Sequence, residues 1–222
     1  MKKNILIKAT ILFIIFVSFG MSTFFYPLLP DKLASHWNIK GEVDGYLSKF
    51  WALFLMPIIS LVLFLFFILI PRIDPLRENI QKFIKYYYGF IIVLILFLYY
   101  IYYITLILNI GFKFNIIQLL IPAFAGLFYY LGILIENLKR NWFIGIRTPW
   151  TLSSDKVWFK THKIGGKLYK TSGAIALLGI SFPDFAIFFI IFPAILFSLY
   201  LLFFSYFEYK KEEKKIKKTK NK

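Results

Sequence analysis

Long apolar runs are the feature that most constrains what this chain can fold into. They cover residues 5–26, 51–70, 86–108, 116–135 and 185–207. A helix of about 20 apolar residues crosses the hydrocarbon core of a bilayer. The 222 residues are 59% hydrophobic and 22% aromatic, which is too apolar for a soluble domain. The runs therefore predict an all-α integral membrane protein.

A sixth, weaker span is indicated between the fourth and the last of these runs. Residues 171–180 are apolar but short, and a helix over 165–180 would measure about 24 Å. That is less than the ~30 Å of a typical hydrocarbon core. Lys167 and Lys170 would then extend toward the interface, as long basic side chains near helix ends do.

Charge placement supports six spans with both termini in the cytoplasm. With that topology, 23 of the 27 Lys and Arg residues fall in cytoplasmic segments and four fall outside. The cytoplasmic loops of membrane proteins carry such an excess of Lys and Arg, which is called the positive-inside bias. The formal charge of +16 is thus better explained by topology and by attraction to anionic lipid than by binding to nucleic acid. The predicted location is the cell membrane, with multiple passes.

The remaining segments complete the predicted organisation. The first run lacks the small-x-small cleavage pattern of a signal peptide, so we interpret it as a span. Cysteine is absent, which excludes disulfides, thiolate zinc sites and a cysteine nucleophile. We divide the chain into residues 1–75, residues 76–207 and a basic tail, residues 208–222, that we expect to be disordered.

The polar segment 29–50 lies outside the cell in this topology. Asn38, Gly41 and Gly45 are turn formers, so the sequence predicts a compact loop and not a helix. Four side chains could in principle surround a metal ion: Asp31, His36, Glu42 and Asp44. Their spacing matches no metal-ligand pattern, so we expect a hydrogen-bonded loop without metal.

The longest polar stretch, residues 141–170, lies on the cytoplasmic side. Pro149 favours an extended conformation at Thr148. Thr151 or Ser153 can then cap a helix that has Asp155 in its first turn, where the helix dipole favours a negative charge. The pattern predicts a helix over residues 154–164.

This predicted helix is amphipathic. Its apolar face carries Val157, Trp158, Thr161 and Ile164, whereas Lys156, Lys160 and Lys163 fall largely on another face. Such a basic amphipathic helix is suited to lying on the inner leaflet. Gly165 and Gly166 either end the helix or let it pack closely against another span.

Three kinds of side chain in this stretch are candidates for a role, and Arg147 and His162 have two readings each. Arg147 is one of four Arg among 23 Lys, so it can serve as a planar, bidentate donor or can bind lipid phosphate. His162 could transfer protons, but we expect it to pack on Trp158 or to bond to backbone. The three tryptophans, Trp142, Trp150 and Trp158, are expected to be interfacial anchors.

Two motifs carry a family resemblance over nearly the whole chain. The outer segment resembles the N-terminal domain of unknown function that accompanies SdpI-type membrane proteins, through Pro30, His36, Asn38, Gly41, Asp44 and Lys49. Ala34 stands where that domain often has proline. The inner stretch resembles the hallmark of the SdpI family, through Asn141, Gly145, Ile146, Arg147, Thr148, Pro149, Thr151, Leu152, Trp158, His162 and Gly166.

The resemblance implies a function that composition and spacing do not. Members like SdpI protect a cell from a secreted antibacterial peptide toxin, and the best-known type also holds a cytoplasmic repressor at the membrane. The expected partners are therefore the lipid bilayer, a peptide toxin outside and a repressor inside, with no direct contact to nucleic acid. No enzymatic activity, cofactor, metal or small-molecule substrate is expected.

Two other classes of function remain as alternatives. A small transporter or channel is disfavoured because the interiors of the spans carry almost no ionisable residues. A membrane enzyme using His162 or His36 is disfavoured because no nucleophile–base pair or metal set is recognisable.

Overall fold

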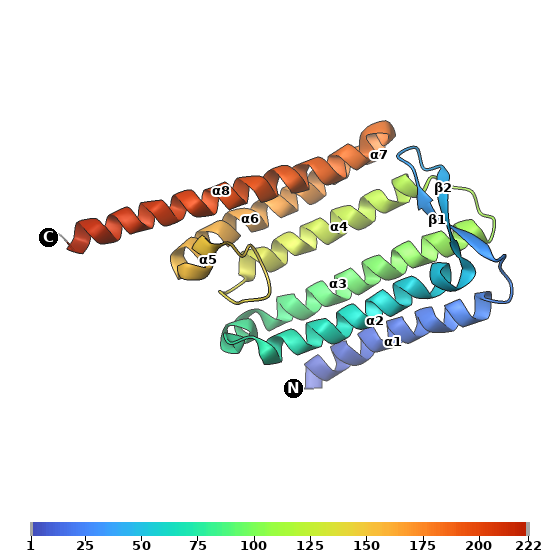
Figure 1. The fold of residues 1–222 in the computed structure, drawn as a ribbon, viewed down its shortest axis with the longest axis horizontal. Helices are drawn as coiled ribbons and strands as arrows, with labels where there is room; N and C mark the ends of the chain where they lie inside the picture. Colours follow the sequence, from blue (N-terminus) through green and yellow to red (C-terminus); the bar gives the residue numbers. More distant parts are fainter. Residues whose placement is uncertain (1, 221–222) are drawn as a thin grey trace.

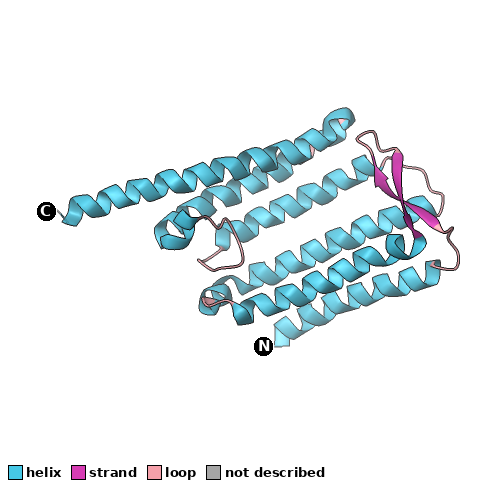
Figure 2. Cartoon of the chain, viewed as in Figure 1, coloured by secondary structure: helices cyan, strands magenta, loops and turns pink. Residues whose placement is uncertain are grey.

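The computed structural model describes residues 2–220 as a bundle of long helices with a small β-hairpin at one end (Figures 1 and 2). The elements, in chain order, are α1 (Lys2–Phe25), β1 (Lys32–Trp37), β2 (Val43–Ser48), α2 (Lys49–Ile73), α3 (Arg77–Asn109), α4 (Ile116–Asn137), α5 (Pro149–Ser153), α6 (Asp155–Ala176), α7 (Leu178–Ser181), the 3-10 turn η1 (Pro183–Phe185) and α8 (Ala186–Lys220). We call the end with the hairpin the hairpin end and the end with α5 the motif end.

Five helices are long and apolar enough to cross a membrane. They are α1, α2, α3, α4 and α8, the last together with η1. Each coincides with one of the five long apolar runs of the sequence. The prediction of a mostly helical, multi-pass membrane protein is therefore confirmed, and the chain is a multi-pass protein of the cell membrane.

Helix α6 is the element that the sequence described least well. It is one helix from Asp155 to Ala176, so the predicted end at Ile164 is wrong. It also does not lie apart on a surface: Figure 1 shows it alongside α4 and α8, with the three axes roughly parallel. The reason is the close approach at Gly166, where an added Cβ would lie 2.8 Å from the carbonyl oxygen of Gly132 on α4. Small residues let two helix backbones meet in this way.

Three of the five lysines of α6 pair with carboxylates on neighbouring helices. Lys163 and Lys170 both bind Glu136 of α4, at 2.5 and 2.6 Å. Lys160 binds Glu208 of α8 at 2.5 Å. These pairs join the basic face of α6 to both neighbouring helices, which explains how a helix with so many charges lies within the bundle.

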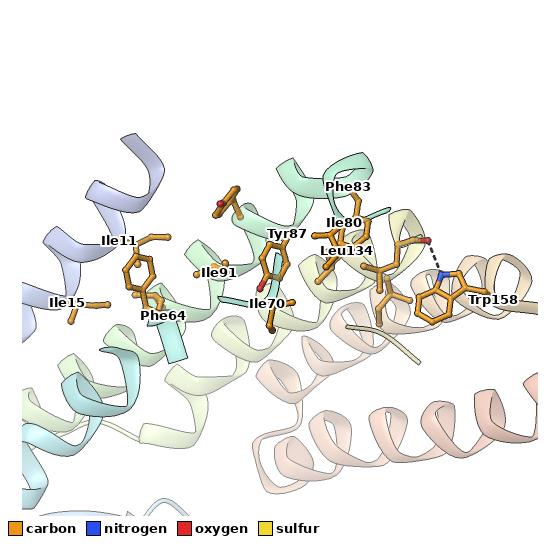
Figure 3. Close-up of a cluster of buried hydrophobic side chains, with 14 residues drawn as sticks. Ile11, Ile15, Phe64, Ile70, Ile80, Phe83, Tyr87, Ile91, Leu134 and Trp158 are labelled. Atoms are coloured by element: carbon orange, nitrogen blue, oxygen red, sulfur yellow. Dashed lines mark hydrogen bonds between the residues drawn. The ribbon is translucent and has the colours of Figure 1, made fainter. Parts of the chain in front are cut away.

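The largest buried cluster joins the first three helices to α4 and α6 (Figure 3). Ile11 and Ile15 of α1 pack near Phe64 of α2, and the cluster continues through Tyr87 of α3 to Trp158 of α6. The motif end of α6 therefore belongs to the same core as the N-terminal helices.

Residues 32–48 form an antiparallel hairpin, which corrects the all-α prediction. Leu33 pairs with Leu47 and Ala34 with Tyr46. The turn is held by Asn38, whose side-chain oxygen accepts hydrogen bonds from the backbone N–H groups of Lys40 and Glu42. The turn formers were recognised in the sequence, but strands this short gave no readable alternation of apolar and polar residues.

The tail is helical and not disordered over the part that the structure describes. Helix α8 continues to Lys220, well beyond the apolar run. Glu213 pairs with Lys210 and Lys217, and Glu208 pairs with Lys211. Ion pairs three and four residues apart support a helix. The prediction of disorder was wrong because it rested on the charged composition of the tail and not on the spacing of its charges.

Candidate functional site at the motif end

The motif loop, which we define as residues 138–154, connects α4 to α6 and is built around Asn141. The Asn141 side chain is fully buried. Its oxygen accepts hydrogen bonds from the N–H groups of Phe143 (3.0 Å) and Ile144 (2.7 Å). Its nitrogen donates to the carbonyl oxygens of Lys139 (2.9 Å) and Ile144 (3.0 Å). One amide thus satisfies four backbone groups of a tight loop, which an aspartate or a leucine could not do.

Gly145 brings this loop against helix α6. Its φ of +113° is a conformation that other residues rarely adopt. An added Cβ would lie 2.5 Å from Nε2 of His162 and 2.8 Å from Leu138. The next residue, Ile146, donates its N–H to that same His162 nitrogen at 3.0 Å. Glycine is required at position 145 for both the turn and the contact.

The two hydrogen bonds of His162 fix its chemical state. Nε2 accepts from a backbone N–H, so it carries no proton, and Nδ1 therefore donates to the carbonyl oxygen of Trp158 at 2.8 Å. Burial lowers the pKa of His162 from 6.5 to about 4, and the Trp158 carbonyl opposes this shift only partly. The imidazole is thus neutral at physiological pH. The expectation that His162 packs on Trp158 and bonds to backbone agrees with this geometry.

Trp158 is a core residue, which corrects the expectation of an interfacial anchor. Its side chain is 2% exposed and stacks on His162 with 3.9 Å between the ring centroids. Its indole N–H donates to the carbonyl oxygen of Leu138, just past the end of α4 (dashed line in Figure 3). Trp142 is 51% exposed, and Trp150 lies edge-on to Tyr206. Of the three tryptophans, Trp158 is the one that belongs to the buried core.

The Thr-Pro-x-Thr sequence forms the short helix α5. Thr148 and Thr151 make a reciprocal capping box, with Pro149 at the first helical position. The hydroxyl of Thr148 also lies 3.0 Å from that of Ser205 on α8. We predicted Thr151 or Ser153 as a cap; the residue that caps α6 is instead Ser154, which accepts the Val157 N–H, with Asp155 in the first turn as expected.

Arg147 is exposed, unlike most of the motif. Its guanidinium donates one hydrogen bond to the carbonyl oxygen of Trp142, at 2.7 Å. In the described part of the chain it makes no ion pair with a carboxylate. Its remaining donors are therefore available to a group outside the chain. Arg140, which sequence reasoning passed over, instead pairs with Asp155 at 2.8 Å.

Asp74 and Asn79 connect the first half of the chain to this site, and neither was recognised from the sequence. Asp74 is 2% exposed, and its carboxylate accepts the N–H groups of Leu76 (2.6 Å) and Trp142 (2.9 Å). The amide of Asn79 donates to the carbonyl oxygen of Arg140 at 2.9 Å. The only sequence signal was an Asp before Pro75, which marks a turn but gives no partner.

The six residues of segment 29–50 that carry the family resemblance, which we call the outer-loop motif, lie at the opposite end of the bundle, in and around the hairpin (Figure 1). His36 and Asp44 face each other across the strands, 2.5 Å apart. Lys49 binds the carbonyl oxygen of Leu29 and the carboxylate of Asp31. Asn38 and Gly41 form the turn, and Pro30 is exposed just before β1. Within residues 2–220, no three metal-binding side chains come together. The two motifs thus form two separate sites.

The fold and these two sites define a class: a helical, multi-pass membrane protein with a structured loop at each end. Comparison with known proteins gives the family. Residues 137–206 match the SdpI/YfhL protein family, and residues 13–61 match a domain of unknown function, DUF1648. Immunity protein SdpI of Bacillus subtilis (strain 168) is 28% identical over 176 residues, which cover 79% of this chain and 80% of that protein.

The resemblance stated from the motifs is thereby confirmed: residues 137–206 match the SdpI/YfhL family, and the chain is similar to an SdpI immunity protein over most of its length. No solved structure matches the chain.

Proposed function

We propose that the chain crosses the membrane six times, with the motif end and both termini in the cytoplasm. The support is the positive-inside bias, since this topology places 23 of the 27 Lys and Arg residues in cytoplasmic segments. The sixth crossing is the part of α6 from Gly165 onward together with α7, because α6 runs alongside α4 and α8 (Figure 1). In this proposal residues 1–75 carry the outer hairpin, residues 76–207 carry the motif loop, and residues 208–222 extend from α8.

The function supported best is immunity to a secreted antimicrobial peptide, without catalysis. The observation that carries it is the similarity to Immunity protein SdpI, which extends over four fifths of both chains. Nothing at the motif end contradicts it: His162 of α6 is buried, neutral and hydrogen-bonded at both ring nitrogens, so its role there is structural. The hairpin end is then the surface that a peptide meets first.

The motif loop also supports a signalling role, in which it holds a cytoplasmic repressor at the membrane. Its fold is fixed by buried bonds, yet Arg147 and Trp142 are exposed side by side on its surface. Arg and Trp are among the residue types enriched at the residues that contribute most binding energy in protein interfaces. A repressor that contacts this pair would be recruited without any change in the bundle.

Immunity is tested by expression in a host that the peptide kills. The full-length chain is expressed, and the lethal dose of each candidate secreted peptide is compared with that for the empty vector. A peptide encoded by a neighbouring gene is the first candidate. We expect the lethal dose to rise for one peptide and not for unrelated peptides. Unchanged killing by all of the candidates contradicts the proposed function.

Arg147→Ala separates the exposed part of the motif from its structural part. We expect membrane insertion to be intact and function to fall by about tenfold or more, because a hydrogen bond to a charged donor contributes about 1.5–3 kcal/mol. Arg147→Lys should not restore it fully, since lysine lacks the planar fork. Lys139→Ala is the matched control, because Lys139 is also exposed on this loop and carries the same charge.

The signalling role has its own measurement. A repressor encoded beside the gene is fused to a fluorescent protein, and its distribution between membrane and cytosol is recorded with and without the killing peptide. We expect recruitment by the wild type and by Lys139→Ala, and not by Arg147→Ala. Recruitment that is equal for all three variants would show that the motif loop is an anchor only.

A further inference from the structure

The two edges of the hairpin differ in whether another part of the chain bonds to their backbone groups. At the β1 edge, the side chain of Asn109, the last residue of α3, bonds to both backbone groups of Ala34. Its oxygen accepts the Ala34 N–H at 2.8 Å, and its nitrogen donates to the Ala34 carbonyl at 3.0 Å. A single amide thus covers the β1 edge in the way that a neighbouring strand would.

These two bonds also show in which direction the backbone groups of β2 point. The N–H and C=O of one residue in a strand point to the same side, so both groups of Ala34 point away from β2. Ala34 is paired with Tyr46, and in such a pair both residues direct these groups outward. Hydrogen-bonded and non-hydrogen-bonded pairs alternate along an antiparallel ladder. The Lys49 N–H donates to the Asp31 carbonyl, so Asp31 and Lys49 are a hydrogen-bonded pair, as expected two positions beyond the inward-pointing pair of Leu33 and Leu47.

The outward groups of Tyr46 have no partner among the described residues. No backbone or side-chain hydrogen bond to them is formed within residues 2–220, beyond the bonds of the strands themselves. The strand is open as well: Tyr46 is 63% exposed, Val43 41% and Leu47 37%. Proteins usually protect such an edge with lysine, proline or a covering segment. Here β1 is covered and β2 is not.

A cavity lies under the same hairpin. It has a volume of about 230 Å³ and is bounded by Trp37 and Leu47 of the hairpin, Trp51 of α2 and Tyr102 of α3. Every second side chain of a strand added to β2 would lie on the face that bears Leu47. Among the residues that line the cavity, Leu47 is the one from β2, so the cavity borders the open strand at Leu47.

We propose that β2 is a docking edge for an extended peptide, which adds a third strand beside Tyr46 and places an apolar side chain in the cavity. Recognition by strand addition uses backbone bonds for affinity and pockets for alternate side chains for specificity. The proposal rests on the proposed function and orientation, because the secreted peptide is then the partner that meets this end. It assigns the binding of that peptide to the N-terminal domain and not to the motif loop.

The test uses the full-length chain in lipid nanodiscs and a defined probe, the end-blocked peptide Thr-Phe-Thr-Phe-Thr-Phe-Thr. Amide hydrogen exchange is measured with and without the probe. We expect exchange at the Tyr46 amide to slow about tenfold when the probe is added. The amides of Leu33 and Leu47, which point into the hairpin, should be slow throughout.

Tyr46→Pro removes the outward N–H without removing a bond between the two strands. We expect it to abolish probe binding while the Leu33 and Leu47 amides stay slow, which shows that the hairpin is still folded. Tyr46→Thr keeps the N–H and should bind the probe. Absence of slowing in the wild type, or equal binding by Tyr46→Pro, overturns the proposal. Slowing that grows with protein concentration in the absence of the probe assigns the edge to a second copy and also overturns it.

The killing assay separates this proposal from the proposed function. If the wild type protects and Tyr46→Pro protects equally, strand addition is refuted and immunity stands. If the probe binds as described and the wild type protects against nothing, the docking edge stands and immunity is refuted. We expect the wild type and Tyr46→Thr to protect and Tyr46→Pro to fail.

Discussion

Gly145→Ala should destabilise the motif loop by two separable effects. The first is backbone strain, because the φ of +113° at this position is a conformation that residues with a Cβ rarely adopt. Such strain costs on the order of 1–3 kcal/mol. The second is steric: the new Cβ would lie 2.5 Å from His162 Nε2, so the imidazole must move and its bond from the Ile146 N–H is lost. Losing a buried hydrogen bond costs about 1–3 kcal/mol.

Gly111 provides the matched control. It has a φ of +106°, and an added Cβ there would meet nothing within 4 Å. Gly111→Ala should therefore show the strain alone, about 1–3 kcal/mol. The difference between the two variants isolates the contact with His162, and we expect Gly145→Ala to lose about 1–3 kcal/mol more than Gly111→Ala.

The assay is equilibrium unfolding in detergent micelles, followed by tryptophan fluorescence, since Trp158 stacks on His162 and reports on the motif loop. Equal losses for Gly145→Ala and Gly111→Ala would refute the contact between the loop and the imidazole. No loss for either would refute the positive φ at both positions.

Three further predictions concern the same end of the bundle. Burial lowers the pKa of His162 from 6.5 to about 4, so as the pH falls the unfolded chain takes up a proton before the folded chain does. The free energy of unfolding should therefore be about 2 kcal/mol lower at pH 5 than at pH 7. A His162→Asn variant that loses as much stability between these pH values contradicts this. Gly166→Ala should force α6 away from α4, at about 1–3 kcal/mol measured by thermal unfolding, whereas Gly126→Ala, in open space on α4, should not destabilise. Asp74→Ala should leave the Trp142 N–H unpaired and lower stability by about 1–3 kcal/mol, with faster exchange of that amide as the local readout; an unchanged exchange rate would rule out the contact.

Local sequence rules predicted the spans well because a bilayer imposes a length and an apolar composition on each crossing helix. The five apolar runs and the five long apolar helices agree within a few residues at their bounds, apart from the extensions of α3 and α8. The rules failed where a partner far along the chain decides the outcome. Helix α6 is the main case: its lysines looked suited to a leaflet surface, whereas Glu136 and Glu208 on other helices bind them.

In the motif, the turn and cap chemistry is local, although we predicted Thr151 or Ser153 as the cap and the structure uses Thr148 for α5 and Ser154 for α6. A proline after Thr148 and a threonine three residues later specify a short capped helix wherever the segment lies, because these bonds are made between near neighbours. The tertiary structure alone decided which side chains face inward. Trp158 and His162 are buried because the motif loop folds back over them through Asn141 and Gly145, and Arg147 is left outside. Burial depends on contacts between residues distant in sequence, which no local pattern encodes. For that reason only the folded chain distinguishes Arg147, the exposed donor, from the buried structural residues of the site.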